Sequence, residues 1–425
     1  MIPRPTPLAF AVAMLLGWTL LLGVLVDRAE LFVMAVPLAL GLLSGGSRHQ
    51  PPRLSLTQEL SAARLSEGDR LLVTVTVASD EPLPIVEVLV AVPAMVQVND
   101  GSNRVVLDVD PAKDADWSFV LLCPARGRFD LGTVYLRFWD RSGLAVYETL
   151  QAKPKPVSVY PYVEPVRNLP RPARTQFSFG NYVSPRLGEG IEPGDIRPFI
   201  PGDRTRHINW RASLRNQQLY VTRFHEERNA DVVLLLDTLS DTGAAPFSTL
   251  DLTVRAAAAL ANAYLARKDR VGFVEFGGFL RWINPGSGRR QAEALVESLL
   301  PAATHFSYVV PQLDRLPVRV LPRQALVIAL TPLLDQRFIN AMIDLVARGF
   351  DVILLAVSPI EPTRRVLRGS LLDDMACQLW AMEWQVKLGE LRRCGLTIAE
   401  WHPEVPLDAV LAPLVRSRPL FAARR

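Results

Sequence analysis

The chain has 425 residues, 49% of them hydrophobic and 21% charged, so it is long enough for two or three domains with separate cores. Its formal net charge of +4 is small for this length, and no strongly basic face is predicted, which argues against a nucleic-acid-binding protein. The three cysteines are widely spaced without a CxxC pair, which argues against a disulfide framework and against a metal or redox site.

Two apolar runs near the start predict a transmembrane helical hairpin over residues 1–48. Residues 8–26 are long and apolar enough to cross a bilayer, and a short polar turn separates them from a second run at 31–43. A cleaved signal peptide is the alternative for the first run, but that run is long for a signal core. One arginine precedes the first run and two follow the second, so the positive-inside rule places both ends in the cytoplasm. We therefore expect a two-helix protein of the inner membrane, with the bilayer as a partner and the bulk of the chain cytoplasmic.

The next region, residues 54–160, has the period of two that is typical of β-strands. Residues 71–77, 86–90 and 134–138 alternate apolar and other side chains, and clusters of turn residues separate such runs. Several short strands at this spacing predict a β-sandwich of immunoglobulin-like size. Residues 161–195 are rich in proline, arginine and glycine without a clear period, and they predict a linker.

Residues 196–425 begin with an arginine-rich stretch, and after it the pattern becomes α/β. Continuous apolar runs predict buried strands at 231–237, 270–276, 325–331, 351–357 and 396–401. Amphipathic stretches between and after them predict helices at 250–267, 291–300, 338–348, 383–394 and 407–415. Because strands and helices alternate, we expect a mostly parallel sheet with helices on both faces.

An arginine-rich stretch with a tight turn precedes these strands. Pro201-Gly202-Asp203 has the residue types that a turn needs, and Trp210 lies among six arginines, Arg197, Arg204, Arg206, Arg211, Arg215 and Arg223. In one interpretation Asp203 and Arg206 tie the stretch to the sheet and Trp210 is a core anchor. In the other, the turn displays Arg204 or Arg211 to a partner.

This stretch resembles the signature of the domain-of-unknown-function 58 family, which reads roughly Arg-x-Tyr-x-Pro-Gly-Asp-Asp-x-Arg-x-Ile-x-Trp and continues to a late acidic residue. The pattern is met here by Arg197, Pro201, Gly202, Asp203, Arg206, Ile208, Trp210, Arg215, Leu219, Val221 and Glu226. Phe199 replaces the tyrosine and Arg204 replaces the second aspartate. The resemblance implies a membrane-anchored protein with a von Willebrand factor type A-like domain, and a MoxR-type AAA+ ATPase as partner. It points to the signature residues, together with Arg223, as an interaction site.

The end of the first α/β strand resembles the cation site of von Willebrand type A domains, where Asp-x-Ser-x-Ser helps to hold a divalent ion. Asp237 is kept here, but Leu239 replaces the first serine and Asp241 the second. Since a hard cation needs several oxygen ligands, the sequence predicts no cofactor, or at most a weakly held magnesium ion. In the structural interpretation Asp237 caps the loop that follows. In the alternative, Asp237, Ser240 and Asp241 form a relaxed magnesium site that a partner's carboxylate completes.

These patterns favour a non-enzymatic, membrane-anchored adaptor or scaffold that works with a MoxR-type AAA+ ATPase in protein-complex assembly or envelope maintenance. No catalytic residue is predicted, because the histidines are scattered and neither a phosphate-binding loop nor a nucleophile elbow occurs. The alternative is a metal-dependent enzyme that uses Asp237 at the carboxyl ends of the strands. A third hypothesis is an envelope structural protein whose sandwich binds another membrane protein.

Overall fold

The structure is a computed structural model that describes residues 4–46, 53–139, 142–171, 176–201, 203, 205–229, 231–305, 307–308 and 311–417. The chain forms two compact units, Met1–Tyr160 and Pro161–Arg425. Each unit is described below by itself.

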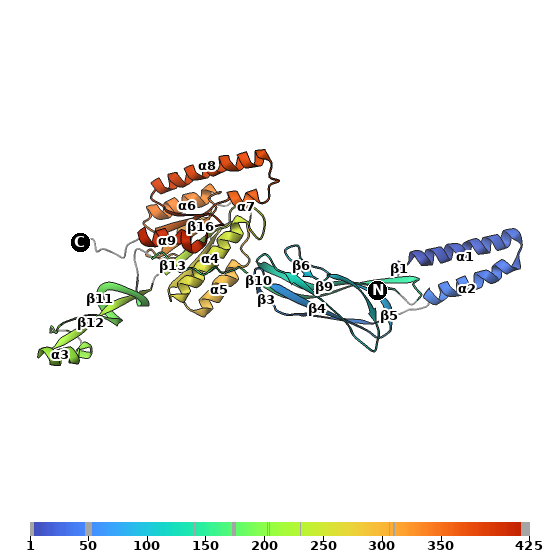
Figure 1. The fold of residues 1–425 in the computed structure, drawn as a ribbon, viewed down its shortest axis with the longest axis horizontal. Helices are drawn as coiled ribbons and strands as arrows, with labels where there is room; N and C mark the ends of the chain where they lie inside the picture. Colours follow the sequence, from blue (N-terminus) through green and yellow to red (C-terminus); the bar gives the residue numbers. More distant parts are fainter. Residues whose placement is uncertain are drawn as a thin grey trace. The chain divides into compact units, whose positions relative to one another are not determined.

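The first unit begins with two apolar helices, α1 (Pro7–Val26) and α2 (Ala29–Gly46), which lie side by side in Figure 1. The side chain of Thr6 caps α1 by accepting a hydrogen bond from the Ala9 amide at 3.2 Å. A Cβ atom on Gly23 would lie 3.1 Å from the ring of Phe32, so glycine at this position lets the helices approach closely. Helix α1 is long and apolar enough to span a membrane, whereas the apolar part of α2 is shorter. A second span therefore stays a prediction.

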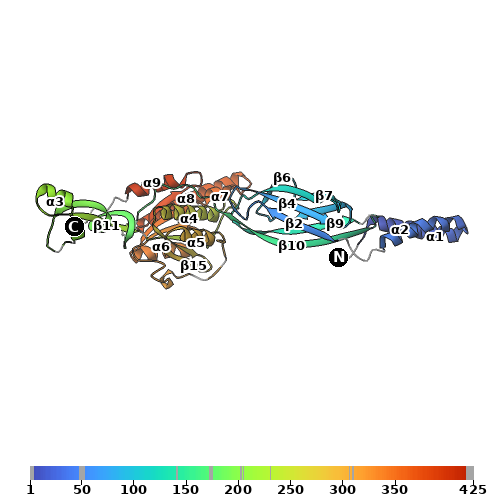
Figure 2. The ribbon, with the colours of Figure 1, turned by 90° about the horizontal axis from the view of Figure 1, so that it is seen from below.

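The rest of this unit is built from two sheets with strand orders β1-β10-β9-β5-β7, with β3 beside β10, and β2-β4-β8-β6. The strands are β1 (Arg4–Pro5), β2 (Leu54–Leu60), β3 (Arg64–Ser66), β4 (Arg70–Ser79), β5 (Leu83–Val90), β6 (Gln97–Asp100), β7 (Arg104–Val109), β8 (Ala115–Leu122), β9 (Gly127–Trp139) and β10 (Ala145–Tyr160). Figure 2 shows the strands of this unit as ribbons. Alternate side chains from both sheets, among them Val75, Phe119, Val88 and Phe138, share one buried cluster. The predicted strand region is thus present, while its immunoglobulin-like identity stays a prediction.

The second unit contains a six-stranded sheet in the order β15-β14-β13-β16-β17-β18. Its strands are β13 (Asp231–Asp237), β14 (Arg270–Phe276), β15 (Leu280–Gly286), β16 (Leu326–Thr331), β17 (Asp351–Val357) and β18 (Thr397–Trp401). All neighbouring pairs are parallel except β14 and β15, so the prediction of a mostly parallel sheet is confirmed. Strand β15 was not predicted, because its Pro285-Gly286 end has the composition of a turn, whereas an edge strand tolerates proline.

Helices cover both faces of this sheet, as predicted (Figure 1). Helices α4 (Thr249–Ala266), α5 (Arg289–Leu299) and α9 (Leu407–Ser417) pack on one face, and α6 (Gln336–Ala347) and α8 (Leu371–Arg393) pack on the other. A short helix, α7 (Ile360–Arg364), precedes α8. Helix α8 begins at Leu371 rather than at the predicted Glu383, because Ser370 and Asp373 form a capping box there.

The region expected to be a linker contains ordered structure that its composition does not reveal. Asp408 accepts hydrogen bonds from the amides of Arg167 and Asn168 at 2.6 and 2.7 Å, and Leu169 is buried in the core beside α4. Further along, β11 (Gln176–Pro198) pairs antiparallel with β12 (Tyr220–Asn229). Both partners, Asp408 and β12, lie far away in the sequence, so local periodicity carries no signal for these contacts.

Candidate functional site

The signature turn is closed by an ion pair between Arg197, on β11, and Asp203. Nη2 of Arg197 lies 2.6 Å from Oδ1 of Asp203, and both side chains are mostly buried. The other carboxylate oxygen of Asp203 accepts a hydrogen bond from the Ile200 amide at 2.9 Å. The predicted partner of Asp203 was Arg206, whose side chain lies outside the described residues. The guanidinium group of Arg197 thus stabilises the turn.

After the turn, a 3-10 segment, η1 (Thr205–His207), leads into α3 (Trp210–Asn216), which is fixed to β12 by two polar residues that the sequence analysis missed. Asn209 caps α3 by accepting from the Ala212 amide at 3.0 Å, and its Nδ2 donates to Oγ1 of Thr222 at 3.1 Å. The Tyr220 amide donates to Oγ of Ser213 at 2.9 Å. An asparagine directly before a short amphipathic stretch was the signal available for this cap.

The apolar side of α3 is exposed. Trp210 is 64% exposed and Leu214 is 81% exposed, so the interpretation of Trp210 as a core anchor is wrong. The reason is local: the seven-residue helix is held by Asn209 and Ser213 and needs no apolar anchor. Arg215, in the last turn of α3, is also exposed.

The remaining signature residues are placed only in part. Pro201 is exposed at the turn. Gly202 lies outside the described residues, and for Arg206, in η1, and Arg223 and Glu226, in β12, only the backbone is described. Their expected interaction roles stay predictions.

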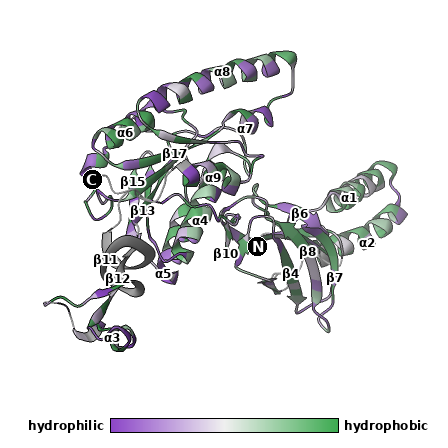
Figure 3. Ribbon diagram, turned by 60° about the vertical axis from the view of Figure 1, so that its left-hand side comes forward, coloured by the Kyte–Doolittle hydropathy of each residue, from purple (hydrophilic) through white to green (hydrophobic). Residues whose placement is uncertain are grey.

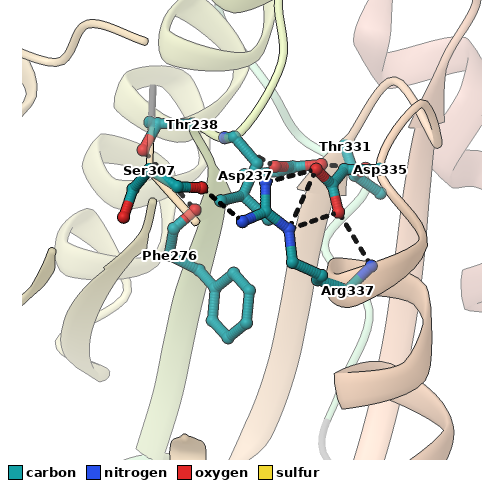
Figure 4. A network of polar contacts seen from close by, with 8 residues as sticks. Asp237, Thr238, Phe276, Ser307, Thr331, Asp335 and Arg337 are labelled. Atoms are coloured by element: carbon teal, nitrogen blue, oxygen red, sulfur yellow. Dashed lines mark hydrogen bonds and ion pairs between the residues drawn. The ribbon is translucent and has the colours of Figure 1, made fainter. Parts of the chain in front are cut away.

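A second candidate lies at the carboxyl end of β13. Counted in chain order, the strands of this sheet run 3-2-1-4-5-6, so the order reverses between β13 and β16. Ligands of open α/β sheets bind beside such a switch point. Asp237 ends β13 there with only 1% of its surface exposed. One oxygen accepts a hydrogen bond from Oγ1 of Thr331 at 2.6 Å (Figure 4). The other accepts from the Leu239 amide at 3.0 Å. The carboxylate therefore joins β16 to the loop that it caps.

Next to this carboxylate stands a cation that the sequence analysis did not single out, Arg337 (Figure 4). Its Nε and Nη2 bind the carboxylate of Asp335 at 3.0 and 2.7 Å, and its Nη1 donates to the Ser307 carbonyl at 2.6 Å. Asp335 is also the N-cap of α6 and accepts from the Arg337 amide at 2.8 Å. An Asp-x-Arg pair at a helix start was the sequence signal for this arrangement.

The electrostatics follow from these contacts. Burial raises the pKa of Asp237 to about 7, against the lowering effects of the hydrogen bonds from Thr331 and Leu239; Asp335 raises this pKa further and Arg337 lowers it. The hydrogen bonds from Arg337 lower the pKa of Asp335. Asp237 is thus a carboxyl that burial makes costly to ionise.

Two of the three candidate magnesium ligands, Asp237 and Asp241, are already bound to structural partners. Asp241 accepts hydrogen bonds from Oγ1 of Thr249 and from the Leu250 amide, at 2.7 and 2.8 Å, so it serves the start of α4. Within the described part of the chain, no group of three or more His, Cys, Asp or Glu residues is placed to hold a metal ion. Because Asp237 already binds Thr331 and Leu239, and because Arg337 supplies a positive charge nearby, these residues do not fit a divalent cation.

A further buried carboxylate, which the sequence analysis missed, lies on the neighbouring strand. Glu275 on β14 binds Nε of Arg281 on β15 at 2.7 Å and accepts a hydrogen bond from Oγ1 of Thr238 at 3.4 Å. A Cβ atom on Gly277 would lie 2.0 Å from Oγ1 of Thr238, so only glycine fits beside this contact. A glutamate inside an apolar strand was the available signal.

Residues 195–367 match the model of the family described as "Protein of unknown function DUF58". Over this segment, which is less than half of the chain, the protein is similar to the DUF58 family. The match covers both candidate sites, since it begins before the signature turn and extends beyond Arg337. The predicted family is thus confirmed.

Curated relatives of this chain include an uncharacterized protein of Mycobacterium tuberculosis and one of Mycobacterium bovis. Each is 26% identical over 123 residues, which is 28% of this chain and 39% of the relative. The chain therefore spans well under half of the length of these relatives.

Among solved structures, similarity extends to a complex of zinc 2-glycoprotein and prolactin inducible protein from human seminal plasma, with a TM-score of 0.16 and 6% identity over 27% of this chain and 99% of that one. The sporulation control protein Spo0M of Bacillus subtilis matches with a TM-score of 0.14 and 12% identity over 25% of this chain and 49% of that one. Scores this low support no argument about fold or function.

Proposed function

We propose that this protein is a non-enzymatic, membrane-anchored adaptor that binds a partner protein through the surface around Trp210. The observation that carries this proposal is the pair Trp210 and Leu214, two large apolar side chains exposed at spacing i, i+4 on an ordered helix. Side chains four residues apart lie on the same face of a helix. Ile200, in the signature turn, is a further exposed apolar residue of this region.

The chemistry of this surface fits a protein partner. Tryptophan and arginine are the residues most enriched among those that dominate binding energy at protein interfaces. Arg211 and Arg215 are also four residues apart and exposed on α3. The complementary surface is therefore an apolar pocket for Trp210 with acidic side chains at its rim.

A MoxR-type AAA+ ATPase is the partner that the family resemblance implies, and the apolar helix α1 supports an adaptor that works at a membrane. The doubly wound strand order supports a von Willebrand type A-like domain without a working cation site. In this proposal the hairpin crosses the inner membrane twice and the bulk of the chain is cytoplasmic, available to a soluble ATPase.

The metal-dependent enzyme is the less favoured alternative, because Asp237 and Asp241 are bound to separate structural partners. Calorimetry with magnesium tests this directly. We expect no binding heat in the parent protein. A heat of binding that disappears in Asp237→Ala would instead support the enzyme hypothesis.

The adaptor proposal is tested by affinity capture of the tagged full-length protein from its own membranes, with and without ATP and magnesium. We expect the parent to recover an AAA+ ATPase in a nucleotide-dependent manner, and the double variant Trp210→Ala, Leu214→Ala to recover at least tenfold less. Phe279→Ala is the matched control, because Phe279 is also a large exposed aromatic residue and lies outside the signature. Equal recovery by both variants would refute the proposed surface. No ATPase under any condition would refute the partner and would favour the structural envelope protein.

A further inference from the structure

Helix α8 carries two apolar faces, and only one of them is used by the fold. Cys377, Trp384, Leu388 and Leu391 are buried against the sheet layer, and the indole of Trp384 donates to the Pro332 carbonyl at 3.3 Å. On the opposite side are six large apolar side chains, each more than half exposed: Leu371, Leu372, Met375, Leu379, Met382 and Val386. We call these six residues the α8 stripe. Figure 3 shows hydrophobic and hydrophilic segments alternating along this helix.

The spacing of the α8 stripe is that of a coiled-coil seam. From Leu372 to Val386 the exposed residues follow one another at intervals of three, four, three and four. This interval repeats every seven residues, which is the spacing with which one helix packs along another. A partner that covers the α8 stripe is therefore expected to be a helix rather than a strand or a loop.

We propose that the α8 stripe binds the α8 stripe of a second copy of this chain, with the two helices antiparallel. A single apolar stripe is self-complementary under a two-fold axis, which is the arrangement of most homodimers. The first turn of α8 carries Asp373 and Asp374, and its last turn carries Arg392 and Arg393. Antiparallel packing keeps the two acidic ends apart, whereas parallel packing would bring like charges together.

The size of the α8 stripe agrees with this occupant. At roughly 100 Å² of apolar surface for each side chain, the six residues offer on the order of 600 Å². A standard interface buries about 800 Å² on each partner, so the stripe and its polar borders approach that size. An isolated patch this large is unusual on a monomer.

The borders of the stripe argue against a lipid surface as the occupant. Glu383 lies four residues after Leu379 and three before Val386, so it borders the stripe, and Glu390 follows on the same side. Both glutamates are exposed. Helices that lie in a membrane interface carry lysine and arginine on their polar face, because these attract anionic lipids.

The test is cysteine cross-linking of the full-length protein in its native membranes. The background variant is Cys394→Ser, because Cys394 is exposed while Cys123 and Cys377 are buried. On this background Leu379→Cys places a thiol at the centre of the stripe. Glu293→Cys is the control, since Glu293 is exposed on α5, on the other face of the sheet. We expect a short bismaleimide to convert at least half of the Leu379→Cys chains to dimers and less than a tenth of the control chains.

Two further experiments decide orientation and specificity. Chains carrying Leu372→Cys should cross-link with chains carrying Val386→Cys at least fivefold better than with themselves, because these positions lie at opposite ends of the stripe. Adding Met382→Arg to Leu379→Cys should reduce the dimer at least fivefold. Dimers of Leu379→Cys at the level of the Glu293→Cys control would overturn the proposal. Preferential cross-linking of Leu372→Cys with itself would overturn the antiparallel arrangement.

Discussion

The strand-end site and the signature turn each contain an arginine–aspartate pair, but they differ in what surrounds the pair. At the strand end, Arg337 and Asp335 lie beside a third polar group, Asp237, that is almost completely buried. At the signature, Arg197 and Asp203 close a turn that precedes an exposed tryptophan. In both places the guanidinium group is bound within the fold. This difference indicates that the charged residues stabilise the local structure. A binding partner would instead contact the side chains that each region exposes.

The largest effect on stability is expected from the buried carboxylate. Asp237→Ala leaves Oγ1 of Thr331 and the Leu239 amide without their partner in a buried site. We expect a loss of about 2–4 kcal/mol in the free energy of unfolding, because each unpaired buried polar group costs about 1–3 kcal/mol. Urea unfolding of the full-length protein in detergent measures this loss. Asp344→Ala is the control, since its ion pair with Arg348 is exposed and should contribute less than about 0.5 kcal/mol. Equal losses in the two variants would contradict a structural role for Asp237.

The pH dependence of stability is the next effect, and its sign follows from the raised pKa. Asp237 has a pKa of about 7 in the fold, above the ordinary value of about 3.9. Between these values the folded protein binds a proton that the unfolded chain has released, so stability falls as pH rises. At about 1.4 kcal/mol for each pKa unit, the contribution amounts to up to about 4 kcal/mol between about pH 4 and pH 7.

The comparison that isolates this contribution is the parent against Asp237→Asn, unfolded at several pH values across that window. The asparagine does not titrate, so the variant should lose less stability than the parent as pH rises from about 4 to about 7. Asp335, whose lowered pKa acts in the opposite direction and at more acidic pH, is present in both proteins and cancels in the difference. Parallel pH profiles would show that Asp237 ionises at its ordinary pKa.

Much of the α/β architecture could be predicted from the sequence, whereas the contacts of the candidate sites could not. The β13 run, Asp231–Asp237, is continuously apolar between two aspartates, and this pattern alone indicates a buried parallel strand. The partner of Asp237 on β16, Thr331, lies 94 residues away, and no local period reports such a contact. Trp210 was misjudged because a tryptophan is usually at least partly buried, and only the short helix around it shows that no core is near. The edge strand β15 was not predicted, because it contains a proline, which is rare in strands.

A smaller effect is expected from the arginine of the strand-end pair. Arg337→Gln removes the paired hydrogen bonds to Asp335 and the bond to the Ser307 carbonyl. We expect a loss of about 1–2 kcal/mol in unfolding free energy, because both side chains are only partly buried. The same variant should raise the pKa of Asp237 further, since Arg337 now lowers it. The decline of stability with pH should therefore move to higher pH, and an unchanged midpoint would show that Arg337 does not act on Asp237.

The smallest effect on stability is expected at the signature. There Asn209 is expected to act in folding and the adjacent Trp210 in partner binding. Asn209→Ala removes the cap of α3 and the bond to Thr222, so it should cost about 1 kcal/mol. Trp210→Ala should change the free energy of unfolding by less than about 0.5 kcal/mol, because most of the side chain is already exposed to water. Partner capture should show the opposite order, with the larger loss in Trp210→Ala, because binding would bury an indole that folding leaves exposed. If Trp210→Ala destabilises the protein more than Asn209→Ala, the tryptophan is a structural residue. The signature would then resemble the strand-end site, where the polar side chains are bound within the fold.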